Sequence, residues 1–138
     1  MGEKHFIGEV AQKAIIEHEG KILFVKNIGN TKWDFPGGRL HTDETSAEGL
    51  AREVLEEVGL EVEIGLPMYV ESVHGEHLKY PRCFIFFVAT LKSSDLTIKM
   101  QVDEIGEVLW VAKNDANSVD TWEPCKSALE KFLNLKDN

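Results

Sequence analysis

The chain has 138 residues, of which 43% are hydrophobic and 28% charged, so we expect one globular domain over residues 1–138. Its net charge of −9 argues against long nucleic acid as the main partner, because phosphate contacts need clustered Lys and Arg side chains. No run approaches about 18 apolar residues, the start lacks a secretory pattern and the two cysteines are too few for a disulfide framework, so we expect a cytoplasmic protein that does not enter a membrane.

The first quarter of the chain predicts a β-hairpin. Residues 7–17 and 21–26 are rich in apolar and β-branched side chains, and Glu19-Gly20 between them is a turn signal. Residues 27–32 have the composition of a loop. We therefore expect two antiparallel strands followed by a surface connection.

Two adjacent glycines follow this connection. We expect Trp33-Asp34-Phe35 to be a short strand and Phe35-Pro36-Gly37-Gly38 to be a tight loop. Glycines allow positive φ and let a backbone approach a ligand closely. A loop of this kind beside acidic side chains can add a carbonyl oxygen to a metal site.

An acidic helix is predicted next, between Thr45 and Gly59. Thr45 followed by Glu48 fits a capping box at its N-terminus, and Gly59 stands where a left-handed C-terminal cap is expected. One apolar stripe is expected to pack on a sheet and consists of Ala47, Leu50, Ala51, Val54, Leu55 and Val58.

Three glutamates share another face of this helix, because Glu53, Glu56 and Glu57 follow i, i+3 and i+4 spacing. Like charges at that spacing destabilise a helix. A hard divalent cation would offset the repulsion, since oxygen-only clusters suit Mg, Mn or Ca. Arg52, one turn from Glu56, is expected to hold a carboxylate and fix its direction. The alternative is a Glu-rich face that is merely solvated.

The second half of the chain predicts further strands and one helix. Strands are expected at residues 61–64, 68–73, 82–91 and 107–111, and polar loops at 74–81 and 114–118, whereas residues 95–102 fit neither pattern. The loop 74–81 is a candidate substrate-facing segment. The last helix should start near Asp120 or Thr121 and bury Cys125, Ala128, Leu129, Phe132 and Leu133. Two one-sided helices and about six strands favour an α/β fold, a mixed sheet with helices on both faces.

The strongest motif spans residues 38–60. Gly38 is followed by five residues, Glu44, seven residues, Arg52-Glu53-Val54, one residue, Glu56-Glu57, one residue and Gly59-Leu60. Seven fixed positions at ordinary residue frequencies arise on the order of once in 10⁸ windows. The stretch resembles the motif of the Nudix hydrolases at every fixed position, with His41 where many members carry a further Glu.

The resemblance implies an α/β/α sandwich with the acidic helix against the sheet. It also implies hydrolysis of a nucleoside diphosphate linked to another group, with Mg²⁺ or Mn²⁺ as the cofactor. The implied metal ligands are the carbonyl of Gly37 and the carboxylates of Glu53, Glu56 and Glu57. The implied catalytic residues are Glu53, Glu56 and Glu104, of which one acts as general base.

Other residues of the motif region receive supporting or substrate-binding roles. Gly38, Glu44, Arg52 and Gly59 are assigned to structure. Arg39 is the candidate for a substrate phosphate, with Lys13 and Lys26 as further candidates that are expected to be solvated. Trp33 is the candidate for stacking on a base, and the other aromatic candidates are Tyr69, Tyr80 and Phe84.

The substrate is left open within this reading. Family members that cleave ADP-ribose tend to carry a proline where Gly75 and Glu76 stand, and those that cleave diadenosine polyphosphates tend to carry a tyrosine where His77 stands. Neither marker is present, and the small size of the protein mildly favours nucleoside triphosphates over sugar nucleotides and dinucleoside polyphosphates. The competing functions are a non-catalytic nucleotide-binding or regulatory module on the same fold and a structural or calcium-binding domain. We expect a small nucleotide as partner and leave a dimer open.

Overall fold

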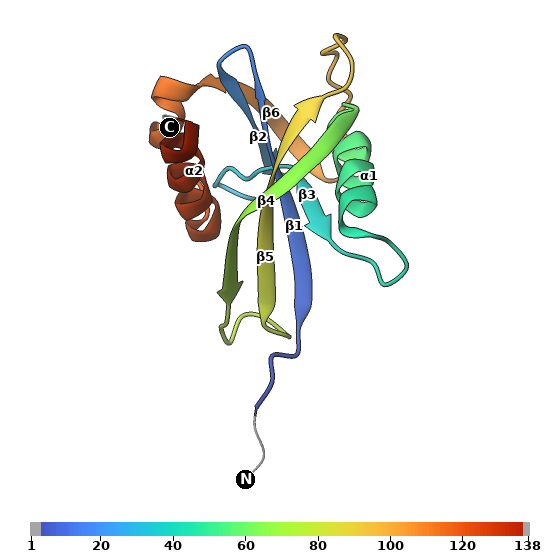
Figure 1. Cartoon of the computed structure of the whole chain (residues 1–138), viewed down its shortest axis with the longest axis vertical. Helices are drawn as coiled ribbons and strands as arrows, with labels where there is room; N and C mark the ends of the chain where they lie inside the picture. The colour runs from blue at the N-terminus through green and yellow to red at the C-terminus, as the bar shows by residue number, and fades with distance from the viewer. Residues whose placement is uncertain (1–3, 137–138) are drawn as a thin grey trace.

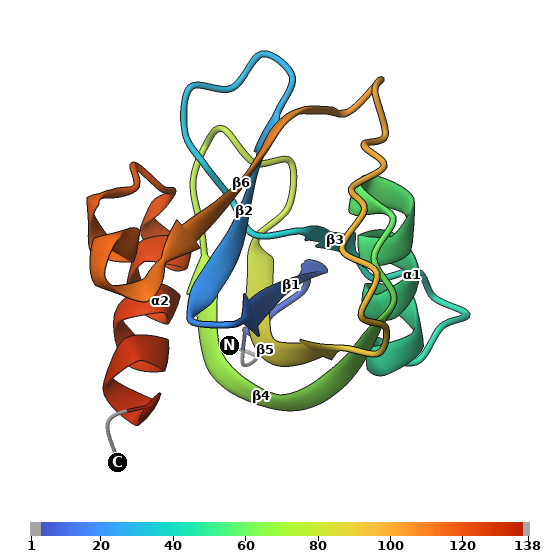
Figure 2. The same ribbon diagram turned by 90° about the horizontal axis from the view of Figure 1, so that it is seen from above.

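In the computed structural model, which describes residues 4–136, the chain forms a six-stranded sheet between two helices. The elements in chain order are β1 (Glu9–His18), β2 (Lys21–Asn27), β3 (Gly37–Arg39), α1 (Ser46–Val58), β4 (Val62–Val73), β5 (Arg82–Leu91), β6 (Ile105–Ala112), the 3-10 helix η1 (Lys113–Ser118) and α2 (Glu123–Lys136). Figures 1 and 2 show α1 on one face of the sheet and α2 on the other. The predicted α/β fold is confirmed.

Strand β1 organises the sheet because it changes partner along its length. The strand order is β4-β5-β1-β2-β6, and β3 also pairs with β1. β1 runs parallel to β5 and antiparallel to both β2 and β3. Its residues 11–13 pair with β3, whereas Glu17 and His18 pair with β2 across the predicted hairpin turn. The short strand β3 therefore lies beside the first half of β1, where α1 also contacts it.

Alternation along β1 divides the core between the two helices. Ala14 and Ile16 belong to the cluster packed against α1, which includes Leu50, Val54 and Val58. Ile15 points to the opposite face and belongs to the cluster packed against α2, which includes Phe24, Phe35, Phe86, Leu129 and Phe132. Both helices are thus fixed by buried apolar faces, as their periodicity predicted.

The expected glycine loop is wrong. Gly37–Arg39 forms β3, while Trp33 and Asp34 make only isolated bridges, to Thr121 and Val25. Pairing with β1 imposes this extended backbone, which a local turn rule does not detect. Gly37 is required there, because its φ is +149° and a Cβ would lie 2.0 Å from the carbonyl oxygen of Gln12.

Smaller differences concern the second half of the chain. The segments predicted as two strands, 61–64 and 68–73, form one strand β4 whose register with β5 shifts between Ile64 and Tyr69. The predicted loop 114–118 is part of η1, and α2 begins at Glu123. Within the described residues, neither helix is long and apolar enough to cross a membrane.

Candidate active site

Helix α1 carries the acidic motif and is capped as its sequence predicts. The backbone N–H of Glu48 donates to the Thr45 hydroxyl over 3.3 Å, and that hydroxyl donates to the Glu48 carboxylate over 2.6 Å. Gly59 ends the helix with φ +77°, and its N–H donates to the carbonyl of Leu55. The predicted N-cap at Thr45 and the left-handed cap are therefore confirmed, whereas the Glu48 carboxylate binds the Thr45 hydroxyl and not the expected backbone N–H.

The buried face of α1 differs from the predicted stripe at its margins. Ala47 and Leu55 are exposed, whereas Leu50, Val54 and Val58 are buried. Glu57 is buried with them, and only 6% of its surface is exposed. The helix thus turns one carboxylate into the protein, which ordinary solvation of an acidic face does not explain.

Two carboxylates of α1, those of Glu53 and Glu57, lie against strand β3. The N–H of Gly37 donates to Oε1 of Glu57 over 3.2 Å. A Cβ on Gly38 would lie 2.9 Å from the carboxyl carbon of Glu53. The two glycines therefore let a strand and a helix approach closely enough to place Glu53 and Glu57 side by side against backbone.

Burial leaves the Glu57 carboxylate short of compensating charge. Desolvation raises the pKa of Glu57 to about 8, and the nearby carboxylates of Glu53 and Asp34 act in the same direction. The ammonium of Lys13 and the Gly37 N–H oppose this shift without cancelling it. A divalent cation would supply the missing positive charge, and the oxygen-only donor set of Glu53, Glu57 and the backbone of Gly37 fits Mg²⁺ or Mn²⁺.

We predict that the metal-free protein loses thermal stability as the pH rises from about 5 to about 8. The folded protein keeps the Glu57 proton up to about pH 8, whereas an unfolded chain releases it near the ordinary value of 4.5. The folded state binds more protons in this interval, so raising the pH favours unfolding. In EDTA, the melting temperature should fall between pH 5 and pH 8 by about 5 °C or more for the wild type and by clearly less for Glu57→Gln. An equal fall in melting temperature for the two proteins would contradict the raised pKa of Glu57.

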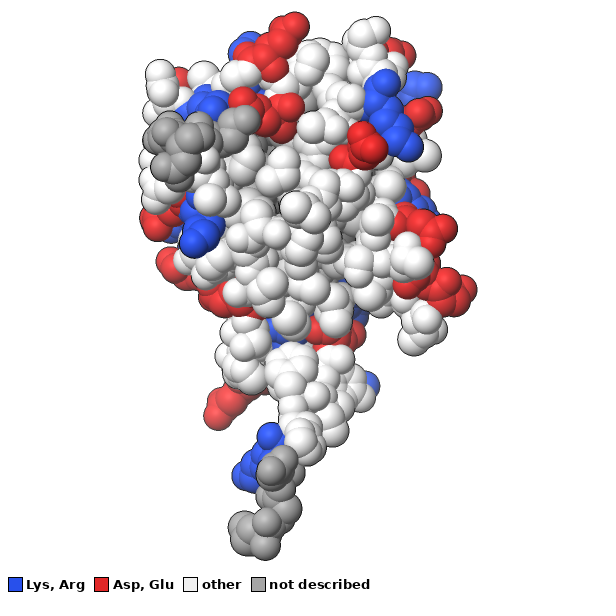
Figure 3. Space-filling model, in the orientation of Figure 1, with Lys and Arg blue, Asp and Glu red and all other residues white. Residues whose placement is uncertain are grey.

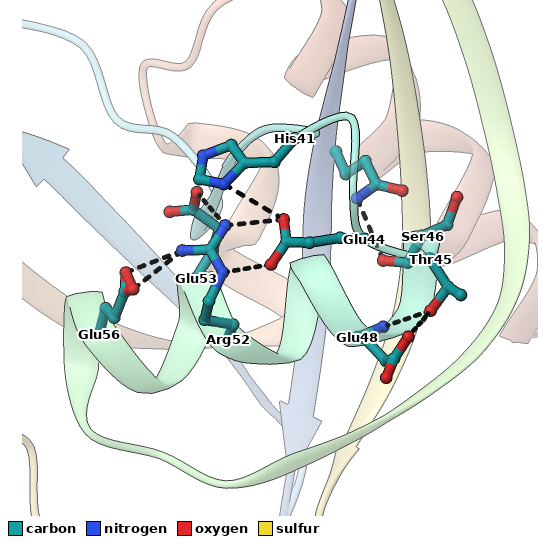
Figure 4. Close-up of polar contacts among 9 residues, drawn as sticks. His41, Glu44, Thr45, Ser46, Glu48, Arg52, Glu53 and Glu56 are labelled. Carbon is teal, nitrogen blue, oxygen red and sulfur yellow. Dashed lines mark hydrogen bonds and ion pairs between the residues drawn. The ribbon is translucent and has the colours of Figure 1, made fainter.

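Arg52 gathers three carboxylates at the outer side of α1 (Figure 4). Its Nη1 donates to both oxygens of Glu56, over 2.8 and 2.9 Å, and its Nη2 donates to Glu53 over 3.2 Å. Its Nε and Nη2 also bind the two oxygens of Glu44. His41 lies 3.6 Å from the same Glu44 carboxylate. Arg52 thus fixes the loop before α1 and the direction of two helix glutamates at once.

The three helix glutamates do not converge. Across residues 4–136, no group of three His, Cys, Asp or Glu side chains is arranged to hold a metal ion. Glu56 is turned toward Arg52, and 46% of its side chain is exposed. In this arrangement Glu53 and Glu57 face β3, and Glu56 would join them only by leaving Arg52. Two of the three predicted carboxylates therefore lie together, and a metal-binding role for Glu56 stays a prediction.

Glu53 and Glu57 line a cleft of about 730 Å³. Nine residues that the sequence analysis singled out line it, namely Lys13, Gly37, Gly38, Arg39, His41, Glu53, Glu57, Phe84 and Glu104. Glu104 is anchored through its backbone, since its carbonyl accepts from the N–H of Ile28 and its N–H donates to Gln101. His77 and Leu78 of the predicted substrate-facing loop also lie in the wall.

A partly buried polar cluster on the cleft wall was missed by the sequence analysis. Nζ of Lys13 lies 2.9 Å from Oδ2 of Asp34, and Oδ1 of Asp34 accepts from the Phe35 N–H and from the Cys125 thiol, over 2.7 and 3.1 Å. Burial raises the pKa of the Cys125 thiol well above its ordinary value, so the thiol is a hydrogen-bond donor there. Lys13 was expected to be solvated but is partly buried. Its place as a charged residue within the apolar run of β1 was the available signal of this position.

The aromatic candidates are distributed differently from the prediction. Trp33 is not among the described residues that line the cleft, because it packs against the α2 core with the Lys26 ammonium 4.6 Å from its ring centroid. Tyr69 packs in that core as well. Phe84 and Trp122 line the cleft instead. The structure thus does not support Trp33 as a stacking residue.

Comparisons with known proteins agree with this geometry. The family model described as the NUDIX domain matches residues 10–132. The chain is 39% identical over 127 residues to the CTP pyrophosphohydrolase of Escherichia coli, covering 89% of this chain and 90% of that one. It is 28% identical over 107 residues to an RNA pyrophosphohydrolase of Haemophilus influenzae, covering 67% and 54%.

A solved structure shares the fold over nearly the whole chain. The NUDIX hydrolase from Nitrosomonas europaea superposes with a TM-score of 0.80 at 25% identity, covering 97% of this chain and 74% of that one. Among the curated relatives, the chain spans about a third of the length of one and nine tenths of another. The family model and the extended sequence match together show that the chain belongs to the Nudix hydrolase family.

Proposed function

We propose that the protein is a divalent-metal-dependent pyrophosphohydrolase that cleaves the diphosphate bond of a small nucleoside diphosphate derivative, with nucleoside triphosphates favoured. The observation that carries this proposal is the pairing of Glu53 and Glu57 against the glycine strand, at the wall of a cleft that also holds Arg39. A buried carboxylate such as that of Glu57, with the Glu53 carboxylate nearby, has a high cost unless a cation accompanies it. The name of the E. coli relative, a CTP pyrophosphohydrolase, supports the same class of reaction.

The residues of the cleft have distinct roles in the proposed reaction. Glu53, Glu57 and the Gly37 carbonyl would hold Mg²⁺ or Mn²⁺, and Glu56 would be recruited from Arg52. When bound, the cation provides Lewis acidity toward phosphoryl oxygens and acidifies water. Arg39 binds phosphate oxygens by charge-assisted hydrogen bonds.

Glu104 is the proposed general base, because it lies on the cleft wall on an anchored backbone segment. It accepts a proton from the attacking water as the new oxygen–phosphorus bond forms. The bridging phosphorus–oxygen bond breaks, and the departing phosphate takes its electron pair. For a triphosphate cleaved at the first bridge, the products are a nucleoside monophosphate and pyrophosphate.

A long nucleic acid is a weaker candidate for the substrate. One relative is named an RNA pyrophosphohydrolase, but the net charge of this chain is −9. On the face drawn in Figure 3, the described basic side chains are scattered among acidic ones and form no continuous stripe. Electrostatic attraction of a polyanion is correspondingly small, so the free nucleotide remains the favoured substrate.

The proposal is tested with a panel of substrates, with Mg²⁺ or Mn²⁺, and with products identified by mass. The panel holds the common nucleoside triphosphates and diphosphates, ADP-ribose, a UDP-sugar, diadenosine tetraphosphate and a short RNA with a 5′-triphosphate. We expect a free nucleoside triphosphate to give the highest kcat/KM and to release pyrophosphate, and EDTA to abolish turnover. Binding of nucleotides without hydrolysis of any panel member would favour the non-catalytic module instead.

A further inference from the structure

A cluster of two arginines and one glutamate stands at the end of the cleft nearest the start of β1. In the sheet Glu9 is the register partner of Arg82 on β5, and Ala11 is the register partner of Arg39 on β3. Oε1 of Glu9 accepts from Nη2 of Arg82 and Oε2 accepts from Nη1 of Arg39, each over 3.0 Å. Both arginines line the cleft. We call these three residues the Arg39–Glu9–Arg82 cluster.

This cluster carries a surplus positive charge. The hydrogen bond from Arg82, followed by the contacts of Arg39, lowers the pKa of Glu9, so its carboxylate is ionised at neutral pH. One carboxylate then faces two guanidinium groups. By contrast, the ammonium of Lys13 at the inner end of the cleft is matched by Asp34. A polyphosphate that carries more negative charge than the metal site neutralises therefore finds an unmatched cation at the Arg82 end.

Donors remain available on both arginines. A guanidinium presents five N–H groups in a planar fork, and Glu9 uses one nitrogen of each side chain. Nε of Arg82 is buried, so the donors left for an anion are on the two terminal nitrogens of this side chain. Phosphate oxygens match this fork by paired hydrogen bonds. Glu9 restrains both side chains without exhausting their capacity to bind an anion.

The order along β1 places Arg82 beyond Arg39 as seen from the carboxylate pair. Gly37 pairs with Lys13, Arg39 with Ala11 and Arg82 with Glu9, so each step along β1 covers two residues, about 7 Å. A phosphate chain that starts at Glu57 and runs past Arg39 therefore continues toward Arg82. The space between is lined by small or apolar groups, Ala11 and Phe84.

Resting on the proposed function, we propose that Arg82, held by Glu9, binds the terminal phosphate of a substrate whose scissile diphosphate lies at Glu53 and Glu57. Arg82 is then a specificity-determining residue that makes nucleoside triphosphates better substrates than the matching diphosphates. The motif at residues 38–60 and its acidic side chains do not by themselves distinguish a triphosphate from a diphosphate.

The test compares kcat/KM for the best triphosphate of the panel and for its diphosphate. Arg82→Met should lower kcat/KM for the triphosphate about 10- to 100-fold and for the diphosphate less than about threefold. Arg82→Lys keeps the charge but loses the fork, and should fall between. Lys79→Met is the matched control, because Lys79 is an exposed cation three residues away that stacks near Tyr80 outside the cleft. It should leave both substrates unchanged.

A second readout separates this inference from the proposed function. Calorimetry with magnesium and inorganic triphosphate measures anion binding without turnover, and Arg82→Met should weaken it at least about tenfold while Lys79→Met does not. Melting curves check that each variant is folded. If Arg82→Met does not fold, the substrate preference and triphosphate binding of Arg82→Lys test the inference in its place. If the wild type hydrolyses nothing in the panel, the proposed function fails and triphosphate binding alone decides the role of Arg82. An unchanged preference for triphosphate in a folded variant, or a wild type that does not bind triphosphate, overturns the inference.

Discussion

Replacing Glu57 with Gln should lower turnover at least about 100-fold and leave the metal-free protein as heat-stable as the wild type near pH 5 and more heat-stable near pH 8. Glu57 is buried, and its carboxylate accepts the Gly37 N–H. Because burial raises its pKa to about 8, the metal-free protein already holds this side chain uncharged at neutral pH, and a Gln keeps its shape and its acceptor oxygen. What Gln cannot supply is the negative charge that a divalent cation requires.

Steady-state kinetics beside melting curves measure the two effects separately. Glu61→Gln is the matched control, because Glu61 is an exposed glutamate just beyond the end of α1. It should change neither turnover nor the melting temperature. Near-normal turnover of Glu57→Gln would remove this residue from the site, whereas a large loss of stability would show that its role is structural.

Gly37→Ala should destabilise the protein by about 3 kcal/mol or more, which is a large part of the stability of a small domain. Two causes act together at this position. The backbone has φ +149°, which L side chains rarely adopt, and the new Cβ would lie 2.0 Å from the carbonyl oxygen of Gln12. That oxygen belongs to the backbone of β1, so it cannot move aside without breaking the pairing of β1 with β3.

Urea unfolding measures the change in the free energy of unfolding. Gly20→Ala is the control that separates the two causes, because Gly20 has φ +76° with nothing within 4 Å of an added Cβ. It should cost roughly 1–2 kcal/mol from backbone strain alone. Equal losses for the two variants would show that close packing of β3 against β1 contributes little.

The features that the sequence predicted correctly are those encoded by neighbours along the chain. Glu19-Gly20 is a local turn signal, and both residues take positive φ between β1 and β2. Thr45 and Gly59 bracket α1 because the side chain and the backbone conformation that cap a helix lie within a few residues of its ends. The resemblance of residues 38–60 to a known motif then supplied the family, which the matches confirm.

The features that were wrong depend on partners distant in sequence. β3 is three residues long and forms because β1 pairs with it. So short a segment has no periodic pattern from which a strand could be predicted. The contact of Arg52 with Glu56, by contrast, joins residues four positions apart on α1, and the helical spacing predicted it.

The polar wall of the cleft shows the same limit. The contact between Lys13 and Asp34 spans 21 positions, and that between Asp34 and Cys125 spans 91. Each of these residues alone has an ordinary explanation as a solvated charge or a core thiol. Only the fold brings them together, on the same cleft as Glu53 and Glu57.

The location of a divalent ion in crystals soaked with Mn²⁺ tests the account most directly. Anomalous scattering from manganese gives its position independently of any assumption about the ligands. We predict a peak at bonding distance from the carboxylates of Glu53 and Glu57, beside Gly37, with Glu56 released from Arg52. Manganese bound elsewhere, with the Gly37 N–H still donating to an otherwise unliganded Glu57, would contradict the account.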